Sequence, residues 1–282
     1  MAVVRARLLG EVLSRSEGRA PILEIRDLHL SFNAVKAIEG VSLTVHTGEI
    51  LAVIGPNGAG KTSVFNCISG LYRPDSGSIS FEGNDLVGLK PYRIANLGVA
   101  RTFQNIELFP QMTVLDNLML GRHRHLRYGT AAAMIRWGRA AREEARNREV
   151  VEVLVEFLGL EPYRKSYVAM LPYGIQKQIE LGRALAAQPR LLLLDEPAAG
   201  MNLEETEDMA RFITDIRREL GIGIILVDHD MRLVMDLADT VLALDFGRPI
   251  AAGPPLEIQS NRDVIRAYLG EEHATAKSGE MT

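Results

Sequence analysis

Cysteine is almost absent from this sequence, since Cys67 is the single one among 282 residues. One cysteine cannot form a disulfide within the chain, and it cannot supply a zinc site built from several thiolates. Long apolar runs are also missing, because no stretch approaches the roughly 18 uncharged residues that a membrane-spanning helix needs. We therefore do not expect the chain to cross a membrane, which leaves open whether it contacts one.

A basic excess is lacking as well. Lys and Arg number 32 against 36 Asp and Glu, which gives a formal net charge of −4. Dedicated nucleic-acid-binding proteins usually carry a strong positive charge, so we expect no nucleic-acid partner. Hydrophobic residues make up 47% and charged residues 24%, a composition typical of a globular protein with one large domain or two modest ones.

The two ends of the chain differ from its centre. Residues 1–21 form a basic extension whose apolar positions have helical spacing but lack the apolar core of a secretory signal. We expect a loosely ordered segment, with a basic amphipathic helix that touches lipid or a partner as the alternative. Residues 22–270 are expected to fold as the domain, and the polar tail 271–282 is expected to be disordered.

Short apolar runs alternate with helical patterns through the domain. Continuous runs predict strands buried on both faces, and alternating runs predict half-buried strands. This order predicts an α/β fold with a mostly parallel sheet, a small antiparallel β region and a helical subdomain inserted at about 112–175. The predicted strands are 22–32, 41–46, 49–54, 78–81, 191–194, 222–227 and a pair within 241–252, and the predicted helices outside the insertion are 60–69, 176–188, 203–220 and 261–270.

A glycine-rich motif follows the strand at 49–54. Residues 55–62 read G-P-N-G-A-G-K-T, which matches G-x-x-x-x-G-K-[ST] between a buried strand and a helix. Triphosphate oxygens need several backbone N–H donors at close range, and glycines let a loop supply them without Cβ clashes. Lys61 would bridge the β- and γ-phosphates, and Thr62 would place its hydroxyl on Mg²⁺. The predicted nucleotide contacts are Gly55, Pro56, Asn57, Gly58, Ala59, Gly60, Lys61, Thr62 and Ser63, with a turn that binds no ligand as the alternative.

Two acids end the strand at 191–194. Asp195 is placed to hold the hydration shell of Mg²⁺, and Glu196 is the candidate to orient or deprotonate an attacking water. Consecutive residues at a strand end can point in different directions, so one acid can face the metal and the other the substrate. This strand should lie close to the phosphate-loop strand, at the carboxyl edge of the sheet where such folds bind ligands. A solvated acidic turn is the alternative.

With these motifs in this order, the chain resembles the ATP-binding subunits of ABC transporters over about residues 22–270. The resemblance implies a P-loop NTPase (RecA-like) core. It also implies that Gln104 contacts Mg²⁺ or the water, that His229 contacts the γ-phosphate and that Phe32 stacks on adenine. The alternatives are an ordinary hydrogen-bonded structural role for His229 and a place in the core for Phe32.

The signature segment of this family departs here from its usual form. In the family it reads L-S-G-G-Q and contacts the ATP held by a second ATPase subunit; the aligned residues are Leu171, Pro172, Tyr173, Gly174 and Ile175. Pro172 supplies neither a serine hydroxyl nor an amide donor. One interpretation is a variant with working ATPase activity. The other is pairing with a different ATPase subunit, which would leave one composite site weak. Asn202 stands where the family has an aspartate that bonds across the dimer.

Several stretches resemble the ATPases of hydrophobic amino-acid importers, and most of all the larger of their two ATPase subunits. They are R-T-F-Q-N-I-E-L-F-P-Q-M-T-V-L-D-N-L at 101–118, the basic helical region at 122–148, D-H-D-M-R-L-V-M at 228–235 and D-V-I-R-A-Y-L-G at 263–270. The implied function is ATP hydrolysis that powers the uptake of branched-chain or related amino acids. The basic residues at 122–127 are expected on a solvated helix face, with lipid headgroups or a partner as the alternative.

The resemblance also implies cofactors and partners. The cofactors are ATP and Mg²⁺, and the partners are two membrane permease subunits, a second ATPase subunit, identical or different, and indirectly a periplasmic substrate-binding protein. The chain would lie on the cytoplasmic face of the bacterial plasma membrane, held there by the permeases. The alternatives are an exporter ATPase for lipid or lipopolysaccharide, an importer of urea, amides or aromatic acids, and a nucleotide-binding module outside transport.

Overall fold

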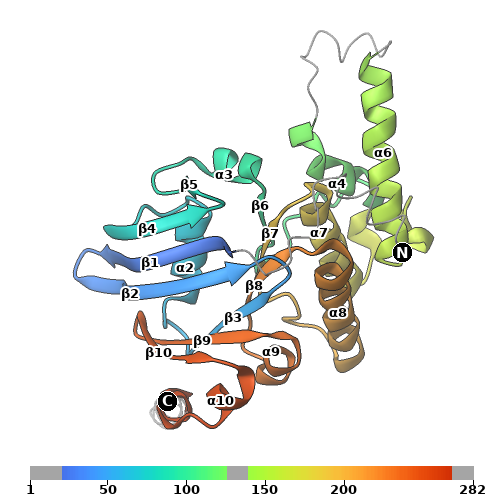
Figure 1. Ribbon diagram of the computed structural model, residues 1–282. Helices are drawn as coiled ribbons and strands as arrows, with labels where there is room; N and C mark the ends of the chain where they lie inside the picture. Colours follow the sequence, from blue (N-terminus) through green and yellow to red (C-terminus); the bar gives the residue numbers. More distant parts are fainter. Residues whose placement is uncertain (1–20, 126–138, 269–282) are drawn as a thin grey trace.

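The computed structural model describes residues 21–125 and 139–268. The C-terminal tail 271–282 and residues 1–20 of the predicted N-terminal extension lie outside these ranges, whereas Pro21, predicted as the end of the extension, begins the first strand. Within them, the strands form two sheets, a four-stranded one in the order β2-β1-β4-β5 and a six-stranded one in the order β10-β9-β3-β8-β7-β6 (Figure 1). The predicted combination of a mostly parallel sheet with a small antiparallel region is confirmed.

The six-stranded sheet is parallel except at one edge, where β10 pairs antiparallel with β9. Every residue of β3, β7 and β8 is buried, as expected for strands covered on both faces. The sequence did not predict the short strand β6. The strands are, across the sheet, β10 (Arg248–Gly253), β9 (Thr240–Asp245), β3 (Ile50–Ile54), β8 (Gly223–Val227), β7 (Leu191–Asp195) and β6 (Val99–Arg101).

The four-stranded sheet is antiparallel throughout. Its first two strands form a long hairpin, in which Phe32 pairs with Val35 at the turn. This pairing starts the second strand at Val35 instead of the predicted residue 41. The strands are, across the sheet, β2 (Val35–His46), β1 (Pro21–Phe32), β4 (Ser76–Phe81) and β5 (Asn84–Asp85).

Side chains from the two faces of the parallel strands enter two separate cores. Leu51 and Val53 face a core shared with the four-stranded sheet and with helix α2 (Lys61–Ile68), which lies behind β1 and β2 in Figure 1. Ile50 and Ala52 face the opposite core, which most of the remaining helices cover. Because successive side chains of a strand point to opposite faces of the sheet, one apolar run contributes residues to both cores.

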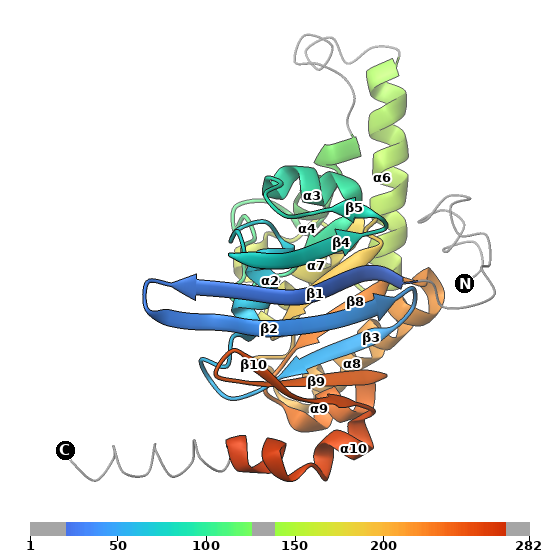
Figure 2. The same ribbon diagram turned by 60° about the vertical axis from the view of Figure 1, so that its left-hand side comes forward.

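Most other helices cover this second face or project from one end of the molecule, where α6 stands upright beside α4 (Figures 1 and 2). No helix in the two described ranges combines the length and the apolar character that crossing a bilayer requires. The helices are α3 (Pro91–Leu97), α4 (Val114–Gly121), α6 (Arg139–Phe157), α7 (Tyr173–Ala186), α8 (Leu203–Asp215) with a π-helical turn at Ile216–Leu220, α9 (Met231–Leu237), α10 (Pro255–Gln259) and residues 262–268; short 3₁₀ turns lie at His123–His125, Glu161–Tyr163 and Val168–Met170.

Arg122, the first residue of the basic stretch 122–127, does not lie on a solvated helix face. Arg122 is buried, and it donates to Oδ1 of Asn147 at 2.9 Å and to the carbonyl oxygen of Ala186 at 2.8 Å. Burial lowers the pKa of this guanidinium to about 10. The expectation was wrong for Arg122 because this side chain ties α4, α6 and α7 together. Residues 126 and 127 lie outside the described ranges.

Candidate active site

The phosphate loop joins the C-terminal end of β3 to the first turn of α2, as predicted. Two of its glycines touch neighbouring backbone: a Cβ would lie 2.2 Å from the carbonyl oxygen of Leu244 at Gly55, and 2.5 Å from that of Ala37 at Gly60. Gly58 instead has open space around it and needs glycine for its φ of +79°. The loop is thus enclosed between the backbones of β9 and β2.

The charged and polar groups of the loop surround the start of α2. The ammonium of Lys61 donates to the carbonyl oxygens of Gly55 at 2.6 Å and Pro56 at 3.0 Å. Thr62 is exposed in the first helical turn, and no side-chain hydrogen bond caps this helix end. The backbone N–H groups and the positive end of the helix dipole at this point suit an anion such as phosphate.

Asp195 and Glu196 face different partners. Asp195 is buried at the end of β7, and its Oδ2 pairs with Nη2 of Arg101 at 2.7 Å. Glu196 follows with a φ of +47°, a conformation that non-glycine residues rarely adopt. Its amide donates to the carbonyl oxygen of Val227 at 2.8 Å, which holds this strained turn against β8.

The three residues predicted to be catalytic, Gln104, Glu196 and His229, meet at a single carboxylate oxygen of Glu196. Nε2 of Gln104 donates to Oε2 of Glu196 at 2.9 Å, across 92 positions of sequence. Nδ1 of His229 lies 3.8 Å from the same oxygen, and its side chain is 67% exposed. The three residues follow β6, β7 and β8, which are neighbours in the parallel sheet. The sheet therefore brings them to one edge, as the position of ligand sites in such folds predicts.

Arg101 was not singled out in the sequence, although it lies three residues before Gln104. Its guanidinium pairs with Asp195 and donates to Oδ1 of Asn66 on α2 at 2.6 Å. It also lies over the rings of Phe65 at 5.4 Å and Phe103 at 5.2 Å. Arg101 therefore links β6, β7 and α2 beneath the site. The sequence feature that could have pointed to Arg101 is its place beside the Gln104 motif.

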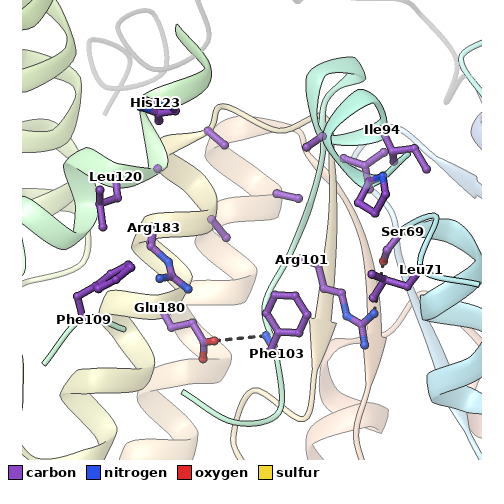
Figure 3. Close-up of a pocket in the computed structure, with 17 residues that line it drawn as sticks. Ser69, Leu71, Ile94, Arg101, Phe103, Phe109, Leu120, His123, Glu180 and Arg183 are labelled. Atoms are coloured by element: carbon purple, nitrogen blue, oxygen red, sulfur yellow. Dashed lines mark hydrogen bonds between the residues drawn. The ribbon is translucent and has the colours of Figure 1, made fainter. Parts of the chain in front are cut away.

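A second charged pair that the sequence did not reveal holds the Gln104 loop from α7. Lys177 and Glu180 are both buried and lie 3.7 Å apart. Lys177 donates to the carbonyl oxygen of Gln104 at 2.8 Å, and Glu180 accepts the amide of Phe103 at 3.3 Å (Figure 3). Burial raises the pKa of the Glu180 carboxyl, an effect that Lys177 partly offsets.

Asp228 is a further buried acid beside the site, and it too was missed. Its Oδ1 accepts the amide of Asp230 at 2.9 Å, whereas its Oδ2 has no hydrogen-bond partner among the described residues. Burial raises the pKa of this carboxyl. Asp230 caps α9 by accepting the amide of Arg232 at 2.9 Å. Asp228 and Asp230 therefore both stabilise the turn that carries His229.

The signature segment lies at the N-terminus of α7 and packs on the segment that follows Glu196. Pro172 is the N-cap of α7, Leu171 is half-buried and Tyr173 is exposed. A Cβ at Gly200 would lie 3.2 Å from the Tyr173 ring, and a Cβ at Gly174 would lie 2.5 Å from a carboxylate oxygen of Glu205. Gly174 thus lets an acidic side chain approach the helix end closely.

Asn202 has a structural role that the sequence analysis did not assign. Its Oδ1 accepts the amide of Glu205 at 3.0 Å, and the Glu205 carboxylate accepts the amide of Asn202 at 3.0 Å. This reciprocal pair is a capping box at the start of α8. Glu205, which also lies against Gly174, therefore connects the start of α8 with the signature helix.

Phe32 lies at the surface, so its assignment to the core was the wrong alternative. The side chain is 44% exposed, and its ring meets that of Tyr72 edge-on at 5.0 Å. Ala37, farther along the same hairpin, is the residue whose carbonyl oxygen adjoins Gly60 of the phosphate loop. The exposed ring of Phe32 on this hairpin, supported edge-on by Tyr72 from the segment after α2, offers a flat apolar face of the kind on which a base stacks.

A cavity of about 570 Å³ opens between α3 and β6 on one side and α4 and α7 on the other (Figure 3). Its walls are mainly apolar, with Ile94, Phe103, Phe109 and Leu120 among them. Arg101, Glu180 and Arg183 also line it. The residues that hold Asp195 and the Gln104 loop therefore form part of this cavity.

The donor set at the site fits magnesium. Asp195 and Thr62 offer a carboxylate and a hydroxyl, both hard oxygen ligands. Within the described residues, no three His, Cys, Asp or Glu side chains cluster into a metal cage. Mg²⁺ keeps several waters and is held by one or two carboxylates together with substrate phosphates, so the Asp195 carboxylate and the Thr62 hydroxyl match its chemistry.

Comparison with known proteins agrees with this geometry. A family model described as "ABC transporter" matches residues 38–199, more than half of the chain. The chain belongs to the ABC transporter family of ATP-binding proteins. As an ABC ATPase it is also matched at residues 248–274 by a model described as "Branched-chain amino acid ATP-binding cassette transporter". The predicted family, fold class and ATPase activity are confirmed.

Individual relatives cover nearly the whole ABC ATPase domain. The high-affinity branched-chain amino acid transport ATP-binding protein BraF of Pseudomonas aeruginosa is 41% identical over 251 residues, 89% of this chain and 98% of BraF. The corresponding protein LivG of Escherichia coli K12 is 39% identical over the same shares. The crystal structure of the ADP conformation of MJ1267, an ATP-binding cassette of an ABC transporter, has a TM-score of 0.78 at 28% identity and covers 89% of this chain and 99% of MJ1267.

Proposed function

We propose that this ABC ATPase is the ATP-hydrolysing subunit of an importer for branched-chain or related amino acids. The observation that carries the hydrolytic part is the convergence of Gln104 and His229 on Glu196, beside Asp195 and the phosphate loop. The import of amino acids is supported by the C-terminal family match and by the relatives named as branched-chain transport proteins. These matches favour import over the exporter alternative.

The loop and the hairpin would bind the nucleotide. Backbone amides from Gly58 to Ser63 and the N-terminus of α2 would hold the phosphates, and Lys61 would neutralise their charge. Phe32 and Tyr72 would stack on the adenine. Gly55, Pro56, Asn57 and Ala59 would shape the loop around the phosphate chain.

The acids would carry the chemistry. Thr62, Asp195 and Gln104 would hold Mg²⁺, which neutralises charge that develops on the phosphates during phosphoryl transfer. Arg101 fixes the orientation of Asp195. Glu196 would orient or deprotonate the attacking water, with Gln104 fixing its carboxylate and His229 placed to contact the γ-phosphate.

A second ATPase subunit, identical or different, would complete each site. Leu171, Pro172, Tyr173, Gly174 and Asn202 would then face its nucleotide. Because Pro172 has no hydroxyl and Glu205 lies against Gly174, this side of the sandwich would bind phosphate weakly. The change Pro172→Ser in the assembled complex should therefore raise the rate of ATP turnover. An unchanged rate would leave the proposal of a weak composite site unsupported.

The apolar cavity beside Gln104 is the proposed docking place for a helix of a permease subunit, so that two ATPase subunits would hold two permeases. It is open, apolar and lined by Arg101 and Glu180, which hold the active-site loop. Through these permeases the chain would lie on the cytoplasmic face of the bacterial plasma membrane. A periplasmic binding protein would deliver the amino acid from the other side.

Co-purification from membranes tests this function. Purification of the intact chain should also yield two permease subunits and a partner ATPase. Recovery of the chain alone would contradict the proposal. Leu120→Asp, which puts a charge in the cavity, should lose the permeases and keep ATP binding. The matched control Leu256→Asp changes an 81% exposed leucine on α10 and should keep both.

Uptake assays would identify the cargo. A strain that depends on this chain should take up labelled leucine, isoleucine or valine in competition with one another. Competition by urea, amides or aromatic acids instead would support the other importer classes, and loss of lipid or lipopolysaccharide export without any uptake defect would support the exporter.

A further inference from the structure

The helical residues 262–268 have no part in the chemistry above, and in Figure 2 they lie next to α10, at the lower edge of the molecule. Asn261 caps them by accepting the amides of Asp263 at 2.9 Å and Val264 at 3.3 Å. Val264 is buried in the core on the helix-covered face of the larger sheet, and Tyr268, one turn later, packs against that core. Positions four residues apart share one helix face, so Val264 anchors the face that carries Tyr268.

Tyr268 contacts the phosphate loop at its first residue. The amide of Gly55 donates to the Tyr268 hydroxyl at 2.8 Å, across 213 residues of sequence. The pairing of β3 with β8 ends at Val53 and its pairing with β9 ends at Ile54. Gly55 is buried just beyond this ladder, so no neighbouring strand accepts its amide in the ladder. The Tyr268 hydroxyl accepts it instead, which provides the hydrogen bond that a buried amide needs.

The peptide groups around Gly55 are held from several directions. The carbonyl oxygen of Leu244 lies 2.2 Å from where a Cβ of Gly55 would be, and Lys61 donates to the carbonyl oxygens of Gly55 and Pro56. Beyond this point, a cavity of about 580 Å³ lies between loop residues 56–59 and the C-terminal helix. The Tyr268 contact therefore acts at the base of a loop that has space behind it.

We propose that Tyr268 is a positioning residue that holds the phosphate loop in its nucleotide-binding conformation, so that the C-terminal segment sets the affinity for ATP and ADP. The proposal rests on the proposed role of the loop as the phosphate site. A preorganised loop loses less conformational freedom on binding. When only a fraction of the molecules hold the competent loop, the apparent affinity falls by that fraction.

The test compares two Tyr→Phe variants of the full-length chain. Tyr268→Phe keeps the ring and removes the hydroxyl that accepts the Gly55 amide. Tyr92→Phe makes the same change at a 58% exposed tyrosine on α3. We measure the dissociation constants for ATP and for ADP in the presence of Mg²⁺, together with amide hydrogen exchange of the peptide that carries Gly55.

Tyr268→Phe should weaken the binding of both nucleotides by about threefold to tenfold, a loss within the range expected for the net contribution of one hydrogen bond. Exchange at the loop should accelerate, whereas peptides from α8 should exchange as in the unchanged chain. Tyr92→Phe should match the unchanged chain throughout. Equal dissociation constants for Tyr268→Phe and the unchanged chain would overturn the proposal and leave Tyr268 as a packing residue.

A second variant separates positioning from folding. Val264→Ala keeps the hydroxyl but loosens the anchor of the helix, so it should also weaken nucleotide binding. A lower melting temperature with unchanged nucleotide affinity would contradict the proposal. Failure of the unchanged chain itself to bind ATP would instead contradict the proposed function, and the two failures are therefore distinct.

Discussion

The two halves of the active site are held by different kinds of contact. The phosphate loop is enclosed by backbone, because Gly55 lies against Leu244 and Gly60 lies against Ala37. The acidic half, which comprises Asp195, Glu196 and the Gln104 loop, is held by charged side chains that are buried or nearly so, such as Arg101. Backbone contacts tolerate almost no change, whereas side-chain contacts can be exchanged without moving a strand.

This difference matches the tasks proposed for the two halves. The loop must present the same amides to every nucleotide, and rigidity serves that purpose. The Gln104 loop lines the cavity proposed to receive the permeases, and Lys177 and Glu180 hold it through its backbone. A site whose acidic half rests on side-chain contacts is suited to respond to a partner.

The largest expected effect concerns the acidic half. Glu196→Gln keeps the shape of the side chain and its contact with Gln104 but removes the base, so ATP turnover should fall by about 10²- to 10⁴-fold. Nucleotide binding, measured by titration, should persist. The control Glu207→Gln changes an exposed acid on α8 and should leave turnover unchanged. Normal hydrolysis by Glu196→Gln would show that another group activates the water.

The next effect tests whether the acidic half depends on its charged pair. Arg101→Met leaves Asp195 buried without its partner, so the free energy of unfolding should fall by about 3–5 kcal/mol in urea denaturation. Arg248→Met removes a pair with Glu39 in which Arg248 is 63% exposed, and it should cost at most about 1 kcal/mol. Equal losses for the two variants would contradict a special dependence of the acidic half on its buried pair.

The third effect tests the backbone contacts of the loop. Gly55→Ala places a methyl group 2.2 Å from the carbonyl oxygen of Leu244 and should lower the free energy of unfolding by about 3 kcal/mol through overpacking and strain. Gly58→Ala meets no atom within 4 Å and should cost about 1 kcal/mol, from its positive φ alone. Chemical denaturation without nucleotide measures both, and a similar cost at the two positions would show that contact with β9 is unimportant.

The contrast between the two halves also explains what the sequence could predict. The phosphate loop is one continuous motif with a strand on one side and a helix on the other, so its residues can be identified from local pattern alone. Asp195 and Glu196 can be identified because a buried strand ends at them. The family resemblance adds Gln104 and His229, and the fold brings both to Glu196.

The residues that the sequence did not reveal act through contacts between distant positions. Arg101 and Asp195 are 94 residues apart, and Gly55 and Tyr268 are 213 residues apart. No local pattern marks such partners, because a lone arginine or tyrosine fits many environments. Arg122 shows the same limit, since a basic run predicts exposure while one of its members fills a gap between three helices.

The smallest expected effect is a change in pH dependence, and it tests how the acidic half holds the Gln104 loop. Burial raises the pKa of Glu180 above its ordinary value of 4.5. The folded chain therefore keeps this proton at pH values where the unfolded chain has lost it. This contribution to stability is present at low pH and is lost as the pH rises from about 4.5 through the raised value.

Glu180→Gln removes the titration but keeps an acceptor for the amide of Phe103. The free energy of unfolding of the unchanged chain should therefore fall, relative to this variant, as the pH rises from about 4.5. Glu161→Gln, at an exposed acid, should show the same slope as the unchanged chain. Urea denaturation across this range measures all three slopes. A slope of the opposite sign would mean that Lys177 outweighs burial, so that the ionised pair itself would hold the Gln104 loop.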